Sequence, residues 1–405
     1  MKQPQQPQPS ALKVFFGRHK KVVSGVIILA AALFVSQVSF IIPIKTDNGN
    51  FFIANYDVAE EDFDHPKLRL LRQREHLDEV IRPGETQFDK LVLLRKWTRK
   101  QWEHKEGSFY YPPWDALEIL DLARKYDNRG FCAQYAIVFL QACLAVGRHA
   151  RYIDLPGHFV AGVWSDGFNK WVVMDPYNDL HYEKNGIPLN GVELCDAYIN
   201  KDIKGIAKVT SDGVKTQITL DDIAVYRSYA VSLRNDHLTE PMEVRVNGAL
   251  KRLTHNPDYH AYPLVGRDNV TIEDFFLSYK PLNGAVMEGR TYTENRNDFK
   301  RDINQTIIYY LKSLTDSQSV KVVLLTDDAP TFKTFLISIN DAPWQEAKNK
   351  LLWELDPGFN KLSARILTKF GWQGRVSSIT LFYKAPWLFN SSKSRNIHRI
   401  TPKSI

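Results

Sequence analysis

Residues 156–176, PGHFVAGVWSDGFNKWVVMDP, contain two alternating apolar runs on either side of Asp166-Gly167. Alternation with a period of two is typical of half-buried strands, and an Asp-Gly pair suits the tight turn of a β-hairpin. With the turn centred on this pair, residues equally distant from the centre face each other. His158 then lies opposite Asp175, and the Cβ atoms of such a pair are about 4.5–5.5 Å apart. The sequence therefore predicts an antiparallel hairpin that brings a histidine and a carboxylate together.

The same register divides the hairpin into two faces. On the face with His158, the register also places Gly162 opposite Trp171. The other face suits a hydrophobic core, because it consists of Phe159, Ala161, Val163, Val172 and Met174. A slip of one residue would exchange the two faces, so we expect the register to be well specified.

A cysteine lies ahead of the hairpin, at the start of the apolar segment Arg129–Arg151. Apolar residues at helical spacing predict a helix that begins near Cys132. The free N–H groups and the dipole of a helix N-terminus stabilise a thiolate, which is the nucleophilic form of cysteine. Together, Cys132, His158 and Asp175 have the composition of an acyl-transfer triad: a nucleophile, a general base and acid, and a carboxylate that orients the imidazole.

Several motifs around these residues resemble the transglutaminase-like superfamily, especially its compact microbial members and the related peptide N-glycanases. They are Gly130-x-Cys132-x-x-x-Ala136, AVGRHARY, GHFVAGVW, KWVVMDP and NGIPLNGVEL. The resemblance covers about residues 85–200. The resemblance implies a papain-like α+β fold without a metal or other cofactor, in which the nucleophile helix packs on a sheet. It also implies that Cys132 is the nucleophile, His158 the base and acid, and Asp175 the orienting carboxylate.

The donor that would stabilise an oxyanion stays open at this point. Relatives often use a tryptophan upstream of the cysteine, and this chain offers Trp97 and Trp102. The backbone N–H of Cys132 is a second source. The other two cysteines, Cys143 and Cys195, suit a hydrophobic core or a disulfide with each other in an oxidising compartment.

An apolar run near the N-terminus indicates a membrane anchor. Val22–Ile44 contains no charged residue over 23 positions, which is long enough to cross a hydrocarbon core of about 30 Å as a helix. Five Lys and Arg residues precede it, whereas only Lys45 appears in the next 20 positions. The positive-inside rule then places residues 1–21 in the cytoplasm and the rest of the chain outside it. A cleaved signal peptide is the alternative.

The net charge of +7 does not indicate a nucleic-acid partner. Five of the basic residues lie in the first 21 positions, so about +2 is left for the folded part and no basic patch is evident.

The rest of the chain divides by pattern. Helical spacing predicts helices within residues 66–81, 85–102 and 114–127. We assign residues 45–214 to the transglutaminase-like domain and residues 215–405 to a β-rich region. Strand-length runs separated by turn residues make a sandwich, similar to an immunoglobulin-like domain, clearest at residues 295–385.

These features predict a membrane-anchored, extracytoplasmic enzyme that attacks an amide carbonyl of a protein, peptide or glycopeptide. The acyl group would pass to water or to an amine, and compact relatives favour water. The alternative is a catalytically inactive module of the same fold that binds or assembles partners at the cell surface. The oligomeric state does not follow from the sequence.

Overall fold

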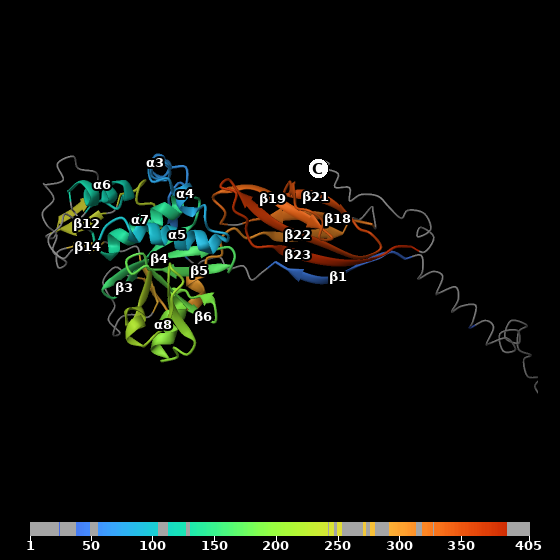
Figure 1. Ribbon diagram of the computed structural model, residues 1–405. Helices are drawn as coiled ribbons and strands as arrows, with labels where there is room; N and C mark the ends of the chain where they lie inside the picture. The colour runs from blue at the N-terminus through green and yellow to red at the C-terminus, as the bar shows by residue number, and fades with distance from the viewer. Residues whose placement is uncertain are drawn as a thin grey trace, which may run out of the picture.

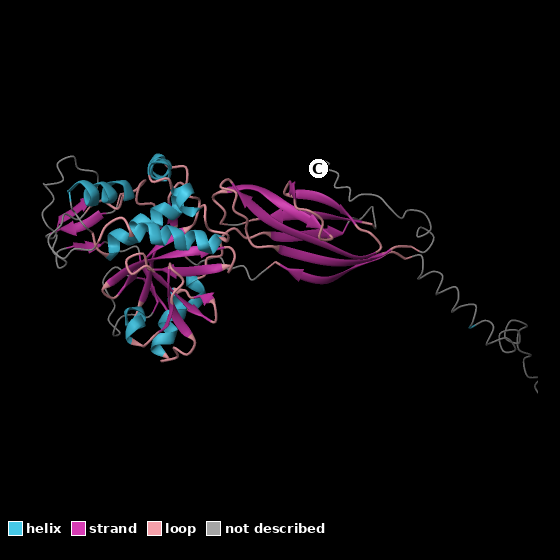
Figure 2. Cartoon of the chain, in the orientation of Figure 1, coloured by secondary structure: helices cyan, strands magenta, loops and turns pink. Residues whose placement is uncertain are grey.

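The computed structural model shows two lobes, one that mixes helices with strands and one built of strands (Figures 1 and 2). We refer to them as the mixed lobe and the β-rich lobe. The structure describes residues 24, 38–48, 56–103, 112–126, 130–241, 243–246, 249–252, 270–272, 276–279, 291–312, 318–326 and 328–386.

The mixed lobe carries the described helices. They are α3 (Pro66–Arg74), α4 (Leu77–Ile81), α5 (Gln87–Arg99), α6 (Ala116–Tyr126), α7 (Cys132–Ala145), α8 (Gly191–Ile199) and the 3-10 helices η1 (Asp221–Arg227) and η5 (Arg296–Phe299). Its strands are β2 (Ala59–Glu60), β3 (Ala150–Leu155), β4 (His158–Ser165), β5 (Lys170–Met174), β6 (Leu180–Lys184), β7 (Ile187–Pro188), β8 (Ile206–Thr210), β9 (Lys215–Gln217), β10 (Tyr229–Ser232), β11 (Arg234–Asn235), β12 (Glu243–Val246), β13 (Ala249–Arg252), β14 (Val270–Ile272), β15 (Phe276–Tyr279) and β16 (Thr291–Thr293).

A six-stranded sheet in the order β16-β15-β10-β3-β4-β5 organises this lobe. On one face, Ala161, Val163, Val172 and Met174 share a hydrophobic core with helices α3 to α7. This is the face that the alternating pattern assigned to the core, which confirms that prediction. On the opposite face, Val160 belongs to a second core with α8, η1 and a small sheet in the order β7-β6-β8-β9.

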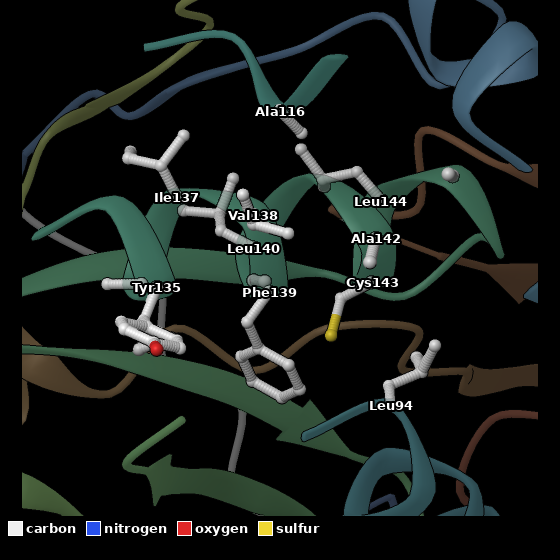
Figure 3. Packing of buried hydrophobic residues seen from close by; sticks show 14 of the residues in the cluster. Leu94, Ala116, Tyr135, Ile137, Val138, Phe139, Leu140, Ala142, Cys143 and Leu144 are labelled. Atoms are coloured by element: carbon white, nitrogen blue, oxygen red, sulfur yellow. The ribbon is translucent and has the colours of Figure 1, made fainter. Parts of the chain in front are cut away.

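Helix α7 lies at the centre of the first core, and every one of its residues is buried. Figure 3 shows Phe139 and Cys143 on one side of this helix and Ile137 and Leu144 on the opposite side. The helix ends before Gly147, which adopts a left-handed φ of 77°. A Cβ at Gly147 would lie 2.2 Å from the ring of Phe370 in the β-rich lobe, so both the backbone and the packing require glycine here.

The predicted helices at 85–102 and 114–127 correspond to α5 and α6. A capping box fixes the start of α5, because Thr86 accepts the Asp89 N–H and Asp89 accepts the Thr86 N–H. The single helix expected over residues 66–81 is instead two helices. His76 separates α3 from α4 with a left-handed φ of 51°.

The β-rich lobe consists of two antiparallel sheets, in the orders β1-β23-β22-β19-β20 and β17-β18-β21. Its strands are β1 (Phe40–Asp47), β17 (Ile307–Lys312), β18 (Ser319–Leu325), β19 (Phe332–Ile339), β20 (Gln345–Ala347), β21 (Lys350–Glu354), β22 (Gly358–Thr368) and β23 (Ser377–Lys384). Residues of both sheets, among them Val322, Ile337 and Leu381, share one core. The strands that the sequence predicted near the C-terminus are those of this lobe.

Two expected boundaries differ from the structure. Residues 40–44, the end of the predicted membrane span, form part of β1, and four of them, Phe40 to Pro43, pair with β23. The expected division between residues 214 and 215 lies within the hairpin of β8 and β9. Beyond it, the chain continues in the mixed lobe, where β10 and β15 extend the sheet of β3 to β5. Strand alternation alone could not distinguish these strands from those of the second lobe.

The rest of the predicted span, residues 22–39, lies almost wholly outside the described residues. Within the part of the chain that the structure does describe, no helix is long and apolar enough to cross a bilayer.

Candidate active site

Cys132 is the first residue of α7, as the sequence predicted. The preceding Phe131 is extended, with φ −107° and ψ −163°, and its N–H donates to Gln134 Oε1 at 3.0 Å. The first N–H groups of a helix have no acceptor within the helix, so the N–H of Cys132 is available to a ligand. Cys132 is 7% exposed. The structure thus places its thiol at the positive end of a buried helix.

The hairpin forms, but its register differs from the prediction by two residues. Trp171 pairs with Trp164 rather than with Gly162, because the turn is a four-residue loop in which Asn169 has a left-handed φ of 50°. Asp166 is the first residue of this loop, and its carboxylate forms a 2.8 Å ion pair with Arg148. The expected pairing of Gly162 with Trp171 is therefore wrong.

A shift of two residues keeps every side chain on its predicted face. His158 is the first residue of β4 and Asp175 directly follows β5, so both lie at the end of the hairpin away from the turn. They are diagonal neighbours rather than directly opposed residues. Their side chains nevertheless meet, with His158 Nε2 2.7 Å from Asp175 Oδ2.

Asp175 is held by two residues. Its Oδ1 accepts the backbone N–H of Asn178, and its Oδ2 accepts both the Asn178 side-chain amide, each at 2.9 Å, and the His158 ring. Burial favours the neutral acid, but His158 and the Asn178 hydrogen bonds outweigh it and lower the pKa of Asp175. Asp175 is therefore a buried carboxylate that stays charged at neutral pH.

His158 connects the carboxylate to the thiol. Burial opposes its positive charge, yet the charge and hydrogen bond of Asp175, together with the nearby Cys132 thiol, outweigh burial and raise the pKa of His158 to about 10. Because Nε2 faces Asp175, Nδ1 is the nitrogen left for Cys132. The imidazole is thus charged at neutral pH and lies between the two other members of the predicted triad.

Aromatic side chains lie next to His158 and the start of α7. The Tyr177 ring makes an edge contact with His158, with centroids 5.9 Å apart, and contacts Tyr135 of α7 at 5.5 Å. Trp102 packs on Tyr135 at 4.2 Å, and its indole N–H donates to the carbonyl of Gly130 at 3.1 Å. Of the two tryptophans considered as oxyanion donors, Trp102 therefore reaches the nucleophile turn, but its N–H is bonded to a carbonyl there.

Sequence reasoning missed the support behind Asp175. Arg95 of α5 is fully buried, and its guanidinium donates to Asp179 at 2.9 Å and to His181 Nδ1 at 2.8 Å. Burial and Arg95 lower the pKa of His181 to about 4, so His181 is neutral and can accept this bond. Only the contact with Asn178 had a signal in the sequence, since Asp side chains in turns commonly accept backbone N–H groups a few residues later.

The three cysteines are free thiols, so Cys143 and Cys195 do not form the disulfide considered from the sequence. Burial raises the pKa of the Cys143 thiol well above its usual range. Cys143 is therefore a core residue. Among the described residues, no three His, Cys, Asp or Glu side chains gather closely enough to hold a metal ion.

Residues 74–176 match the model of the transglutaminase-like superfamily. This stretch contains Cys132, His158 and Asp175. The chain therefore includes a transglutaminase-like domain, a type generally found in cysteine-dependent enzymes with a papain-like fold. No curated protein matches the chain.

Proposed function

We propose that the transglutaminase-like domain is a cysteine-dependent amide hydrolase or acyltransferase acting on proteins, peptides or glycopeptides. One observation carries the proposal: His158 Nε2 lies 2.7 Å from Asp175 Oδ2, and Asp175 and the nearby Cys132 thiol raise the pKa of its imidazole to about 10. A charged imidazole beside a cysteine favours the thiolate, and its proton is then available to a leaving group.

The first half-reaction forms a thioester. The Cys132 sulfur attacks the amide carbonyl, and the resulting oxyanion accepts the backbone N–H of Cys132 at the start of α7. His158 gives its proton to the departing amine, whose bond to the carbonyl carbon breaks. Asp175 keeps the ring oriented and stabilises its charge while it is protonated.

The second half-reaction releases the acyl group. Neutral His158 takes a proton from water or from an amine, which attacks the thioester carbonyl. The C–S bond then breaks and returns the thiolate, while His158 is charged again. We favour water as the acceptor, following the compact relatives that this domain resembles.

A second candidate is a binding or assembly module in which these residues do not turn over. The low exposure of the site favours it, because Cys132 is 7% and the His158 side chain 13% exposed. Such a module would keep the fold but show no enhanced reactivity at Cys132.

Alkylation by iodoacetamide, with sites resolved by mass spectrometry, separates the two candidates without a known substrate. The enzyme should be labelled first at Cys132. His158→Ala should slow this labelling strongly, and Asp175→Ala less, because the carboxylate acts on the thiol only through the ring. His237→Ala is the matched control, since His237 is another buried histidine. Equal labelling rates in wild type and His158→Ala would exclude the enzyme.

The choice of acceptor needs a second measurement. Wild type is incubated with candidate amide substrates, and the intact mass reports a thioester adduct at Cys132. Adding a primary amine then traps the acyl group as a new amide if the enzyme transfers it to amines. Release of the free acid despite excess amine would identify a hydrolase.

We also propose that Val22 to about Ser39 anchors the protein with its lobes outside the cytoplasm. The charge asymmetry of the sequence supports this orientation. Protease added to spheroplasts should digest the chain beyond about residue 50 and spare residues 1–21. Protection of the lobes would contradict the proposal, and a soluble form beginning near residue 40 would indicate a cleaved signal.

A further inference from the structure

A large cleft lies at the turn end of the hairpin, away from Cys132. It has a volume of about 1040 Å³ and is bordered by the end of β1, the β4–β5 turn, the start of α8 and residues 294–302. Trp164 lines it, six residues along β4 from His158. At about 3.3 Å per residue, the two positions are about 20 Å apart. The cleft is therefore separate from the candidate active site.

Arg151 of β3 lines this cleft and is 8% exposed. Its guanidinium lies 4.2 Å from the centre of the Trp171 ring. It donates to the Phe299 carbonyl at 3.3 Å and to the Tyr229 hydroxyl at 3.2 Å. Gly162 of the neighbouring strand β4 is paired with Arg151. A Cβ at Gly162 would lie 3.2–3.3 Å from the Arg151 side chain, so the glycine leaves room for the arginine.

The contacts of Arg151 do not neutralise its charge. A guanidinium has five N–H donors, and only two are used by these acceptors, while Nε has no partner. No carboxylate of the described residues forms a salt bridge with it. Burial, with the nearby charge of Arg301, lowers its pKa. A buried charge without a counterion is costly, so an arginine held in this way is unusual unless an anion joins it.

Three other cations that line the cleft differ from Arg151 because they have acidic partners, and one of them, Arg296, forms an ion pair with Asp196 at 2.7 Å. Lys170 forms an ion pair with Glu193 at 2.5 Å, and Arg375 one with Asp47 at 3.3 Å. Arg151 is therefore a buried cation of the cleft lining that forms no ion pair with the described residues.

We propose that this cleft binds an oxyanion, a carboxylate or phosphate group, on the guanidinium of Arg151. One N–H on each terminal nitrogen remains after the bonds to Phe299 and Tyr229, and two parallel donors suit the two oxygens of such a group. Tyr229 also lines the cleft, and its hydroxyl, which accepts from Arg151, keeps its own O–H as a further donor. The site is independent of the proposed chemistry at Cys132.

The test measures binding of two small probes to the purified full-length chain. Inorganic phosphate and acetate are titrated separately, with sodium chloride at equal ionic strength as the reference. Melting temperature and tryptophan fluorescence are followed, because Trp171 lies against Arg151. We expect a saturable rise in melting temperature with at least one probe. A response to phosphate alone identifies a tetrahedral anion, whereas a response to acetate identifies a carboxylate. No saturable response to either probe beyond the chloride reference overturns the proposal.

Two variants locate the binding. Arg151→Gln should raise the half-saturating probe concentration at least tenfold, whereas Arg375→Gln, which removes a paired cation of the same cleft, should change it less than about threefold. Both should keep the wild-type alkylation rate at Cys132, which reports an intact fold. Equal binding in wild type and Arg151→Gln overturns the proposal.

Should Arg151→Gln fail to fold, hydrogen exchange on the wild type decides. Saturating probe should protect amides near Arg151, in Tyr229–Ser232 and at Phe299. Protection confined to other segments would overturn the proposal that the probe binds at Arg151.

Discussion

Replacing Asp175 with asparagine keeps the shape of the side chain but removes its charge. The Asp175 side chain is 5% exposed and lies 2.7 Å from a ring that is 13% exposed. The contacts of that ring with Asp175 and Cys132 outweigh burial and raise the pKa of His158 from 6.5 to about 10. At 1.36 kcal/mol per pKa unit, the difference corresponds to about 5 kcal/mol. Removing one member of a buried ion pair commonly costs about 3–5 kcal/mol. We therefore expect Asp175→Asn to lower the free energy of unfolding by about 3–5 kcal/mol at pH 6.

The loss should depend on pH with a definite sign. The pKa of His158 is higher in the folded than in the unfolded protein, so its stabilisation is complete below about pH 6.5 and disappears as the pH rises towards 10. The difference between wild type and Asp175→Asn should therefore shrink between pH 6.5 and 10.

Urea unfolding, followed by circular dichroism at pH 6, 8 and 10, measures this difference. Asp202→Asn is the control, because Asp202 forms an exposed ion pair with Lys184 at 3.2 Å and should hardly affect stability. A loss below about 1 kcal/mol at pH 6, or an equal loss at pH 6 and pH 10, would refute the reasoning.

Three further outcomes are expected. Thiol reagents should reach Cys143 only after unfolding, because it is fully buried, so early labelling of Cys143 in the native protein would contradict its place in the core. Inserting one residue within β5, between Val172 and Val173, should abolish activity and fast alkylation of Cys132, because a one-residue shift exchanges the two faces of the strand between the insertion and Asp175; full activity of the insertion variant would show that register is irrelevant. Trp372→Ala should destabilise the protein by about 1–3 kcal/mol in calorimetry, because the indole N–H donates to the Val146 carbonyl at 2.8 Å across the lobes; an unchanged melting profile would argue against this contact.

The sequence was sufficient to find the three residues of the candidate site. Helical spacing placed Cys132 at the start of a helix, and alternation placed His158 and Asp175 on one face of a hairpin. The predicted face of the two side chains is correct although the predicted register is wrong by two residues, because side chains in a strand alternate with a period of two. The register itself follows from a four-residue loop in which Asn169 has a left-handed φ, and the choice of this loop over a two-residue Asp-Gly turn had no clear signal in the sequence.

Other features depend on contacts between distant segments. The contact of Arg95 with Asp179 joins residues 84 positions apart, and nothing in the pattern of α5 distinguishes this arginine from an exposed one. The end of the apolar run was also ambiguous. Residues 40–44 are apolar enough for a membrane helix, but Ile41 belongs to the core of the β-rich lobe, and only the pairing with β23 reveals it.

That pairing has a consequence for how the protein is made. Strand β1 leaves the ribosome early, whereas its partner is among the last segments synthesised: Val38 and Lys384, which share a hydrogen bond, are 346 positions apart. At about 5–20 residues per second, β1 waits ~20–70 s for β23. The whole mixed lobe is synthesised in that interval and is in effect an insertion between the first strand of the β-rich lobe and the rest. The β-rich lobe can therefore be completed only when translation is nearly finished, and until then β1 is an unpaired strand.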